Sequence, residues 1–488
     1  MIHVSDLMHA KRCARFAWNK KYNPLPYESF YHLECPFSQV WSQYLHIEDS
    51  VCGTVGDSNE KTLELLKKNK IVRFARFTYK DCRTKIPVLI QEEDGYKAIY
   101  PYLSAYPKES EALVMKINQM ICAHCGISIK NHEIVYLDKD FVREGQLSLE
   151  NLFSTSDCLF NRRNHLGKSI QKCMDQLEVN LDEWIESVQK LLNGACPKAM
   201  RSKNCTSGRR CIYYDLCFDE SQECDDSVLF LTTSREKLHA YEKGIHQVKD
   251  LDVSLLEGFP LQYAQVMASR KESYFCDRVA LGEWNQSIQY PISYLDFEWD
   301  TFALPPYRGM KPFDVLCFQY SLHIEDEQGK LTHTDFFQSG DCRVPFIESL
   351  IENVPKTGSI LVYNMEGAEK LRLIQLGEQF PKYKEKLEQI YSRMIDLSKP
   401  FEQGIFYDNR MRGHYSLKNI LPVFSDTYSY ANLEIRDGMT AVHAYRTYDK
   451  VEEEEKLNIR ENIRTYCSMD TFAEYVVYHG LLKILREE

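Results

Sequence analysis

The stretch ISYLDFEWD, residues 292–300, decides the fold of the second half of the chain. Its apolar run predicts a buried strand, and two carboxylates, Asp296 and Glu298, follow with one residue between them. Residues i and i+2 of a strand point to the same face, so these carboxylates converge while Phe297 points into the core. Converging carboxylates beside an apolar layer repel each other and lose hydration unless a divalent cation lies between them. The pair therefore indicates a metal site, and the alternative is a solvated pair at a strand end.

The composition is that of a globular protein with several domains. Its 488 residues suffice for about two to four domains, and 44% hydrophobic and 27% charged residues are ordinary proportions. The sequence has neither a long apolar run nor a signal peptide, so we expect a cytoplasmic protein without a membrane partner. A net charge of −11 argues against a wholly basic nucleic-acid binder, although a locally basic face suffices for binding. The 17 cysteines predict core residues and metal or cluster ligands rather than disulfides.

The succession of strand and helix patterns predicts an α/β multi-domain protein in three parts. Residues 1–225 form a mixed α/β block, residues 226–288 a helical connector, and residues 289–488 a second α/β block. In the first block we predict strands at 72–80, 86–90, 96–103 and 133–138, and helices at 111–126 and 181–194. In the last block we predict strands at 291–297, 314–324, 332–338 and 358–364, and helices at 366–379, 383–394 and 459–485.

Two segments of the last block supply further candidate ligands. The strand SILVYN ends at Asn364, and the residues after it carry Glu366 and Glu369 at a position where α/β sheets build sites. The alternative for these glutamates is a favourable interaction with the dipole of the following helix. In the late apolar helix TYCSMDTFAEYVVYHGLL, Tyr466 and Asp470 are four residues apart and share one face. An acidic side chain on such a helix is costly unless it is solvated or paired, and a metal would offset that cost.

The order of these motifs resembles the DEDD family of 3′–5′ exonucleases, which has a ribonuclease H-like fold. The motifs are DFE, then YN and a glutamate at a strand–helix junction, then YxxxD on a late helix. The resemblance is to the tyrosine subclass, because the position where the histidine subclass has His is Thr465. It implies that four acids hold two Mg²⁺ or Mn²⁺ ions and that Tyr466 orients the attacking water. These acids are Asp296, Glu298, Glu369 and Asp470. The third position departs from the family, which usually has Asp there, and Glu366 is the alternative to Glu369.

A wider resemblance covers nearly the whole chain. Five stretches of the sequence are similar to a bacterial family of unknown function. They are FPLQYAQ, YPISYLDFEWDTFALPPYRGMKPFDVLCFQYSLH, IDLSKPF, GHYSLKNILPVF and YCSMDTFAEY. That family fuses a RecB-like iron–sulfur nuclease-type module to a DEDD-like domain. GHYSLKN is a polar, basic loop before a helix, and such loops offer backbone N–H groups and cations to phosphate. His414 and Lys418, together with Asn364, are therefore candidate nucleic-acid contacts, and the alternative is a solvated loop.

The first block ends in three cysteines, Cys205, Cys211 and Cys217, with five residues between successive members. Zinc ribbons use pairs two to four residues apart, whereas three clustered cysteines and a distant fourth are common for a [4Fe–4S] cluster. The distant candidate is Cys13. The arrangement resembles the iron–sulfur RecB-like nucleases of CRISPR adaptation and of recombinational helicase–nucleases, in which the cluster joins the two ends of the module. The rival ligands are Cys196, Cys224 and the pair Cys122 and Cys125.

The same block lacks the residues of a working nuclease. A RecB-like module of the PD-(D/E)XK type needs an Asp on one strand and an [E/D]xK on the next. In the matching segments TKIPVLI and AIYPYLSAYPK, Pro87 stands about where the Asp belongs and Tyr100–Pro101–Tyr102 where the ExK belongs. We therefore predict a degenerate, catalytically inactive module held together by an iron–sulfur cluster. The alternative is a displaced site built from Asp81, Glu92, Glu93 or Asp94.

The sequence thus predicts a metal-dependent nuclease, a 3′–5′ exonuclease on single-stranded DNA with a two-metal mechanism in residues 289–488. The expected cofactors are two Mg²⁺ or Mn²⁺ ions and a [4Fe–4S] cluster, and the expected partner is DNA in preference to RNA. The alternative is a non-catalytic nucleic-acid-binding or assembly protein in which both nuclease modules have drifted. Pathway, protein partners and oligomeric state do not follow from the sequence.

Overall fold

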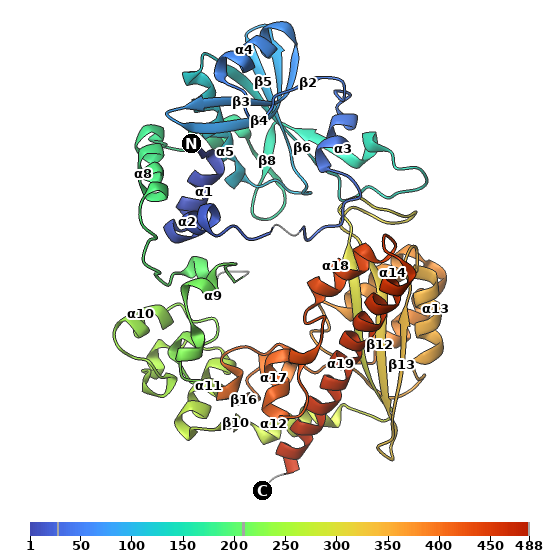
Figure 1. Ribbon diagram of the computed structural model, residues 1–488. Coiled ribbons are helices and arrows are strands. Elements are labelled where there is room, and N and C mark those ends of the chain that lie inside the picture. Colours follow the sequence, from blue (N-terminus) through green and yellow to red (C-terminus); the bar gives the residue numbers. More distant parts are fainter. Residues whose placement is uncertain (27–28, 207–209, 487–488) are drawn as a thin grey trace. The chain divides into compact units, whose positions relative to one another are not determined.

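The computed structural model describes residues 1–488 except 27–28, 207–209 and 487–488. The chain divides into two compact units. Unit 1 comprises Met1–Phe218 and Phe302–Asp314, and unit 2 comprises Asp219–Thr301 and Val315–Glu488. Each unit contains a β-sheet covered by helices (Figure 1), which confirms the expected α/β multi-domain class. Residues 226–288, expected to connect two domains, pack within unit 2.

Unit 1 is built on a seven-stranded sheet. Its strands lie in the order β2 (Val51–Cys52), β3 (Ile71–Tyr79), β4 (Cys82–Glu92), β5 (Gly95–Pro101), β6 (Ile129–Leu137) and β7 (Phe153–Ser156), and β1 (Ile2–His3) pairs with β4. The consecutive strands β3, β4 and β5 pair antiparallel, which confirms the predicted meander. A crossover through α5 (Ala112–His124) then brings β6 into parallel pairing with β5.

Helices pack against this sheet in two hydrophobic clusters. The larger cluster contains buried residues of α1 (Val4–Arg12), α2 (Ala14–Tyr22), α4 (Asn59–Lys68), α5, α7 (Ile170–Asp175) and α8 (Leu181–Asn193). The smaller cluster contains residues of α3 (Phe37–Tyr44) and α6 (Leu149–Leu152). A hairpin of β8 (Cys158–Phe160) and β9 (Leu166–Ser169) and the short α9 (Tyr214–Cys217) complete the unit.

Unit 2 contains a five-stranded mixed sheet. Its strands lie in the order β13 (Leu331–Phe337), β12 (Val315–Glu325), β11 (Ile292–Thr301), β14 (Ile360–Val362) and β15 (Met394–Asp396). β12 runs antiparallel to both neighbours, while β14 and β15 run parallel to β11. The four predicted strands correspond to β11–β14, but β15 occupies the end of a segment expected to be helical. The three residues MID are too few to distinguish the repeat of a strand from that of a helix, so the pattern alone did not reveal this strand.

Helices cover the two faces of the unit 2 sheet. On one face α13 (Arg343–Asn353), α14 (Glu369–Gln379) and α15 (Lys384–Tyr391) enclose a core that includes Phe297, as its position in the strand predicted. On the other face α19 (Glu453–Arg486) packs against β11 and β12 and also contacts α17 (Leu417–Phe424) and α18 (Gly438–Tyr448) (Figure 1). Side chains alternate along β11, so its acidic residues Asp296 and Glu298 face α19.

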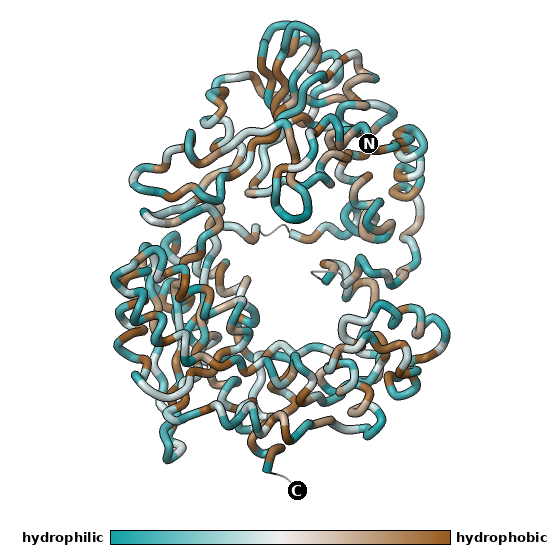
Figure 2. Tube along the Cα trace, turned by 180° about the vertical axis from the view of Figure 1, so that it is seen from behind, coloured by the Kyte–Doolittle hydropathy of each residue, from teal (hydrophilic) through white to brown (hydrophobic). Residues whose placement is uncertain are grey.

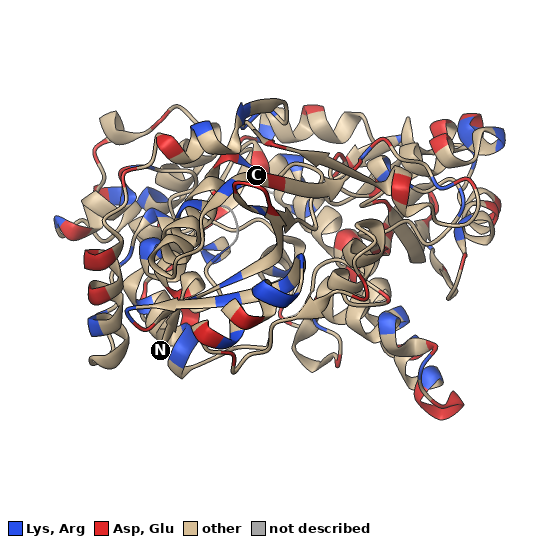
Figure 3. Cartoon of the chain, turned by 90° about the horizontal axis from the view of Figure 1, so that it is seen from above, with Lys and Arg blue, Asp and Glu red and all other residues tan. Residues whose placement is uncertain are grey.

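The remainder of unit 2 is a smaller helical region. It contains α10 (Lys237–Glu242), α11 (Pro260–Lys271), α12 (Arg278–Gln286) and α16 (Lys399–Glu402), with an antiparallel pair of β10 (Tyr274–Cys276) and β16 (Phe406–Asp408). Hydrophobic and hydrophilic residues alternate along both units (Figure 2), and basic and acidic residues are interspersed (Figure 3). Within the described ranges, the helices are all too short or too polar to cross a lipid bilayer.

Candidate metal centre

The exposed fractions and partners of the β11 acids differ sharply along one strand face. Asp296, Glu298 and Asp300 alternate along the strand, and Asp300 is fully buried. The Arg446 guanidinium donates to both oxygens of Asp300, with the closest approach from Nη2 at 2.6 Å. Across the described part of the chain, no basic side chain forms an ion pair with Asp296 or Glu298. The fold therefore balances the third carboxylate with an arginine and leaves the first two without such a partner.

Asp470 of α19 joins these two carboxylates. Asp296, Glu298 and Asp470 each offer one oxygen, and these three oxygens lie within 4.8 Å of one another. We call these three residues the acidic triad. Glu298 and Asp470 are each 8% exposed, and Asp296 is half-buried. Among the described residues, no other three His, Cys, Asp or Glu side chains form so close a group, and such a set of oxygens suits a hard divalent cation.

The buried face of α19 fixes the orientation of the triad. The Cys467 thiol donates to Asp296 Oδ2 over 3.2 Å, and the Tyr430 hydroxyl donates to Asp470 Oδ1 over 2.6 Å. Tyr466, one turn before Asp470, is 5% exposed, and its side chain lowers the pKa of that carboxyl group. The predicted pair of Tyr466 and Asp470 thus shares one buried helix face, and Tyr430 is a positioning residue that sequence reasoning missed.

Glu369 lies beside the triad, whereas Glu366 does not. Glu369 is the first residue of α14, is 2% exposed, and its Oε2 has no hydrogen-bond partner among the described residues. Its carboxyl group interacts electrostatically with Asp296. Glu366 precedes the helix, is exposed, and pairs with Lys370 Nζ at 2.7 Å. Of the two glutamates left open by the sequence, the structure brings Glu369 to the site.

The turn that starts α14 explains this selection. Asn364 follows β14 in the left-handed region with φ of 65°, a conformation that Asn tolerates better than most residues. The backbone N–H groups of Asn364 and Met365 both donate to the carboxylate of Asp396, each over 3.1 Å. This anchor delays the helix until Glu369, which therefore points inward. The side chain of Asn364, a predicted nucleic-acid contact, is exposed.

Burial and mutual repulsion raise the pKa of these carboxyl groups. Desolvation is the largest cause for Asp296, Glu298 and Glu369, and neighbouring carboxylates raise the pKa of each further, well above its ordinary value. Desolvation raises the pKa of Asp470 to about 6, against the hydrogen bond from Tyr430, which lowers it. The charged forms are thus disfavoured in the metal-free protein, as expected where a cation has its place.

Lys418 lies near the triad rather than on an open loop. It is the second residue of α17, and its Nζ lies 5.0 Å from the centre of the Tyr466 ring and 5.4 Å from that of Tyr430. Its charge lowers the pKa of all three carboxyl groups of the triad, against the effect of burial. Lys418 therefore supplies positive charge inside the site. His414, the other predicted phosphate contact of this segment, is exposed.

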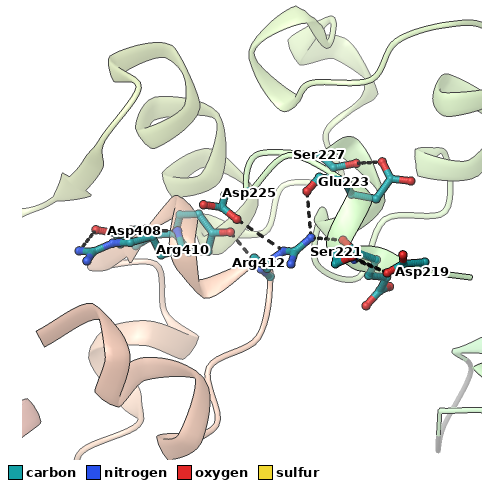
Figure 4. A network of polar contacts seen from close by, with 11 residues as sticks. Asp219, Ser221, Glu223, Asp225, Ser227, Asp408, Arg410 and Arg412 are labelled. Carbon is teal, nitrogen blue, oxygen red and sulfur yellow. Dashed lines mark hydrogen bonds and ion pairs between the residues drawn. The ribbon is translucent and has the colours of Figure 1, made fainter. Parts of the chain in front are cut away.

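The turn before α17 is firmly anchored, and Figure 4 shows the network around it. Arg412 Nη2 donates to the carbonyl oxygen of Glu223 over 3.0 Å, and its Nε lies 3.7 Å from Asp225 Oδ1. Gly413 follows with φ of 74°, and a Cβ atom there would lie 2.0 Å from the carbonyl oxygen of Phe230. Only glycine fits this close approach, so the glycine of GHYSLKN sets the direction in which the chain enters α17.

Cysteines from the two ends of unit 1 line a single cavity. Cys13, between α1 and α2, lies on this cavity with Cys205, Cys211 and Cys217. Of the rival ligands, Cys196 is exposed, Cys224 belongs to unit 2, and Cys122 and Cys125 lie at the end of α5 in the core. The structure thus brings together the four cysteines named from the sequence.

The distances between cysteine sulfurs differ between a zinc site and an iron–sulfur cluster. Thiolates around one tetrahedral zinc lie about 3.8 Å apart, given a Zn–S distance of about 2.3 Å. Within the described ranges, no three cysteine sulfurs lie within 4.8 Å of one another. A tetrahedral zinc site with closely spaced sulfurs is therefore not preformed among the described cysteines. Four thiolates are the donors that a [4Fe–4S] cluster takes, and the four cysteines on this cavity are of that type.

Within the described part of unit 1, no close acidic group lies at the strands where a RecB-like nuclease would have one. Tyr100 is 4% exposed and stacks on His132, with ring centres 6.1 Å apart. The antiparallel register pairs Val88 with Ile99, the neighbours of Pro87 and Tyr100. The acids of the alternative, displaced site lie apart from these strand positions. Asp81 pairs with the N-terminal amine at 2.7 Å, and Glu92, Glu93 and Asp94 are exposed at the β4–β5 turn.

Comparison with known protein families gives a match in the second half of the chain. Residues 293–416 match the model of a family described as a domain of unknown function (DUF2779). The matched stretch runs from β11 to the loop before α17, so it includes Asp296, Glu298 and Glu369 and ends before Asp470. No curated protein and no solved structure matches the chain.

Proposed function

We propose that this chain is a metal-dependent nuclease, a 3′–5′ exonuclease on single-stranded DNA, whose chemistry takes place in unit 2. The observation that carries the proposal is the acidic triad, whose oxygens lie within 4.8 Å of one another without an arginine or lysine ion pair among the described residues. The mixed sheet with helices on both faces and acids on its central strand supports a ribonuclease H-like domain of DEDD type.

In this proposal Asp296, Glu298, Glu369 and Asp470 hold two Mg²⁺ or Mn²⁺ ions. The donor set fits, because all four are carboxylates and Glu369 Oε2 has no partner of its own among the described residues. Bound divalent cations lower the pKa of water and stabilise the leaving oxygen of a phosphodiester. The protein positions the ligands through the Cys467–Asp296 and Tyr430–Asp470 hydrogen bonds.

Two side chains of the site act on substrate and water in this proposal. Burial and the neighbouring carboxylates raise the pKa of Tyr466 far above its ordinary value, so its phenol keeps the proton at neutral pH. Tyr466 therefore orients the attacking water by hydrogen bonding and does not remove its proton. Lys418, close to the Tyr466 ring, offers positive charge to the phosphate that reacts.

Unit 1 has a supporting role in the proposal. We infer a degenerate RecB-like module in which a [4Fe–4S] cluster, held by Cys13, Cys205, Cys211 and Cys217, joins the N-terminal helices to the segment after α8. The support for this inference is the shared cavity of the four cysteines. The one close acidic group found among the described residues belongs to unit 2, which supports the proposal that the chemistry takes place there.

The test is degradation of single-stranded DNA in the presence of Mn²⁺. With 5′-labelled substrate we expect a ladder that shortens from the 3′ end, and a 3′-terminal phosphorothioate slows it. Asp296→Asn is expected to abolish the ladder, whereas Glu366→Gln, at an exposed ion-paired site, leaves it unchanged. Full activity of Asp296→Asn refutes the site. DNA binding without any hydrolysis supports the alternative of a non-catalytic binding protein.

A further inference from the structure

Glu474 is a buried carboxylate that the four-acid site does not use. It lies on α19 one turn after Asp470, so the two side chains share a helix face. Its neighbours on that face, Ala473 and Val477, are fully buried, and Glu474 itself is 1% exposed. Helix α19 packs against β11, which carries Asp296, and contacts β14, the strand that precedes Glu369 in the chain.

Glu474 lacks the partners that the fold gives to other buried acids. Glu325, 2% exposed on β12, accepts hydrogen bonds from the Tyr294 hydroxyl at 2.8 Å and from His479 Nε2 at 3.0 Å. Asp300 has Arg446. Glu474 Oε2, by contrast, has no hydrogen-bond partner among the described residues. An unpaired buried oxygen of this kind costs free energy and calls for a ligand or a function.

The electrostatic surroundings of Glu474 are themselves acidic. The groups that act on it most strongly are, in order, Asp296, Glu369, Asp470 and Asp396, and all four are carboxyl groups. These groups come from β11, α14, α19 and β15, so acidic side chains from four elements act on Glu474. Either a proton or a cation must neutralise a buried carboxylate among carboxylates.

We propose that Glu474 is a fifth carboxylate ligand of the divalent cations. The inference rests on the proposed function and deepens it, because it names a residue outside the four-acid motif. Its unpartnered oxygen, its burial and its position one turn from Asp470 carry the argument. An additional charged oxygen ligand tightens binding of a hard cation.

The experiment uses the full chain and Mn²⁺ alone, without nucleic acid. Glu474→Gln keeps the side-chain shape and removes the charge, and Glu325→Gln is the matched control for a buried, partnered glutamate. By calorimetric titration we expect two Mn²⁺ per wild-type chain. We expect Glu474→Gln to lose one of them or to bind it at least about tenfold more weakly. Glu325→Gln is expected to retain both.

Thermal unfolding in EDTA gives a second readout with opposite signs for the two variants. Glu474→Gln is expected to unfold at a higher temperature than the wild type, because it removes an unpaired, repelled carboxylate. Glu325→Gln is expected to unfold at a lower temperature, because it weakens hydrogen bonds to a charged acceptor.

Three results overturn the role of Glu474. These are unchanged Mn²⁺ stoichiometry and affinity in Glu474→Gln, a lower unfolding temperature in EDTA, and a variant that does not fold. The last two indicate a carboxylate that the fold itself requires. A wild-type chain that binds no Mn²⁺ is a different outcome, since it refutes the proposed function and this inference together. Two Mn²⁺ bound with equal affinity by the wild type and Glu474→Gln refutes the role of Glu474 alone.

Discussion

Replacing Asp470 by Asn in the metal-free protein is expected to stabilise unit 2 at neutral pH. Asp470 is buried in the acidic triad, and desolvation raises the pKa of its carboxyl group from 3.8 to about 6. The group has a higher pKa in the folded state than in the unfolded state, so the folded state binds its proton more readily. The metal-free protein therefore loses stability as pH rises from about 4 through 6.

The magnitude follows from the size of that rise. A rise from 3.8 to about 6 corresponds to about 3 kcal/mol of destabilisation once the pH exceeds 6. Asp470→Asn removes this penalty, and the Asn oxygen can still accept the hydrogen bond from Tyr430. For a domain of this size about 3 kcal/mol corresponds to an increase of roughly 6–12 °C in unfolding temperature. Near pH 4.5 both proteins are largely neutral at this position, and the difference shrinks.

Differential scanning calorimetry in EDTA at pH 7.5 and pH 4.5 measures the effect. The matched control is Asp300→Asn. Asp300 lies on the same face of β11 as Asp296 and Glu298 but is paired with Arg446. Leaving that arginine buried without its partner is expected to cost about 3–5 kcal/mol, so the control lowers the unfolding temperature. An Asp470→Asn protein that is less stable than the wild type at pH 7.5, or equally shifted at both pH values, refutes the reasoning.

Three further predictions concern separate parts of the molecule. Anaerobically purified wild-type protein is expected to be brown, with about four iron atoms per chain by elemental analysis. Cys211→Ser is expected to lose most of that iron and exposed Cys196→Ser to keep it, while stoichiometric zinc in a colourless protein contradicts the cluster. Lys418→Met is expected to weaken DNA binding and flatten its salt dependence in filter-binding assays, and an unchanged salt slope counts against the phosphate contact. Glu369→Gln is expected to lower kcat at least about 100-fold, whereas Glu366→Gln keeps it, and equal rates refute the selection of Glu369.

The sequence predicts those parts of the site that depend on local periodicity. The alternation of β11 placed Asp296 and Glu298 on one face and Phe297 in the core, and both placements hold. The four-residue spacing on α19 likewise placed Tyr466 and Asp470 together. Such inferences need only the geometry of one element, because a strand alternates and a helix repeats about every four residues.

Partners from distant parts of the chain could not be predicted in this way. Nothing in the sequence shows that Arg446 balances Asp300 or that Tyr430 donates to Asp470. The sequence favoured Glu369 but left Glu366 open, because the start of the helix depends on the Asp396 anchor, which comes from the unrecognised strand β15. Glu474 did leave a signal, since it lies four residues after Asp470 in an apolar helix.

The arrangement of acids in unit 2 illustrates how a site can oppose the stability of its own fold. Elsewhere in the unit, buried acids such as Asp300 and Glu325 have cationic or hydrogen-bonding partners. In the site, Glu369 and Glu474 each leave an oxygen without a partner among the described residues. A domain that retains this cost is expected to recover it on binding its ligand.

The most direct measurement is anomalous X-ray scattering from crystals soaked with Mn²⁺. We expect two anomalous peaks in unit 2, one within coordination distance of Asp296, Glu298 and Asp470 and one on the side of Glu369. Crystals of Asp296→Asn are expected to lose them. Soaked wild-type crystals with no peak at Asp296 contradict the central claim that these carboxylates form a divalent-metal centre.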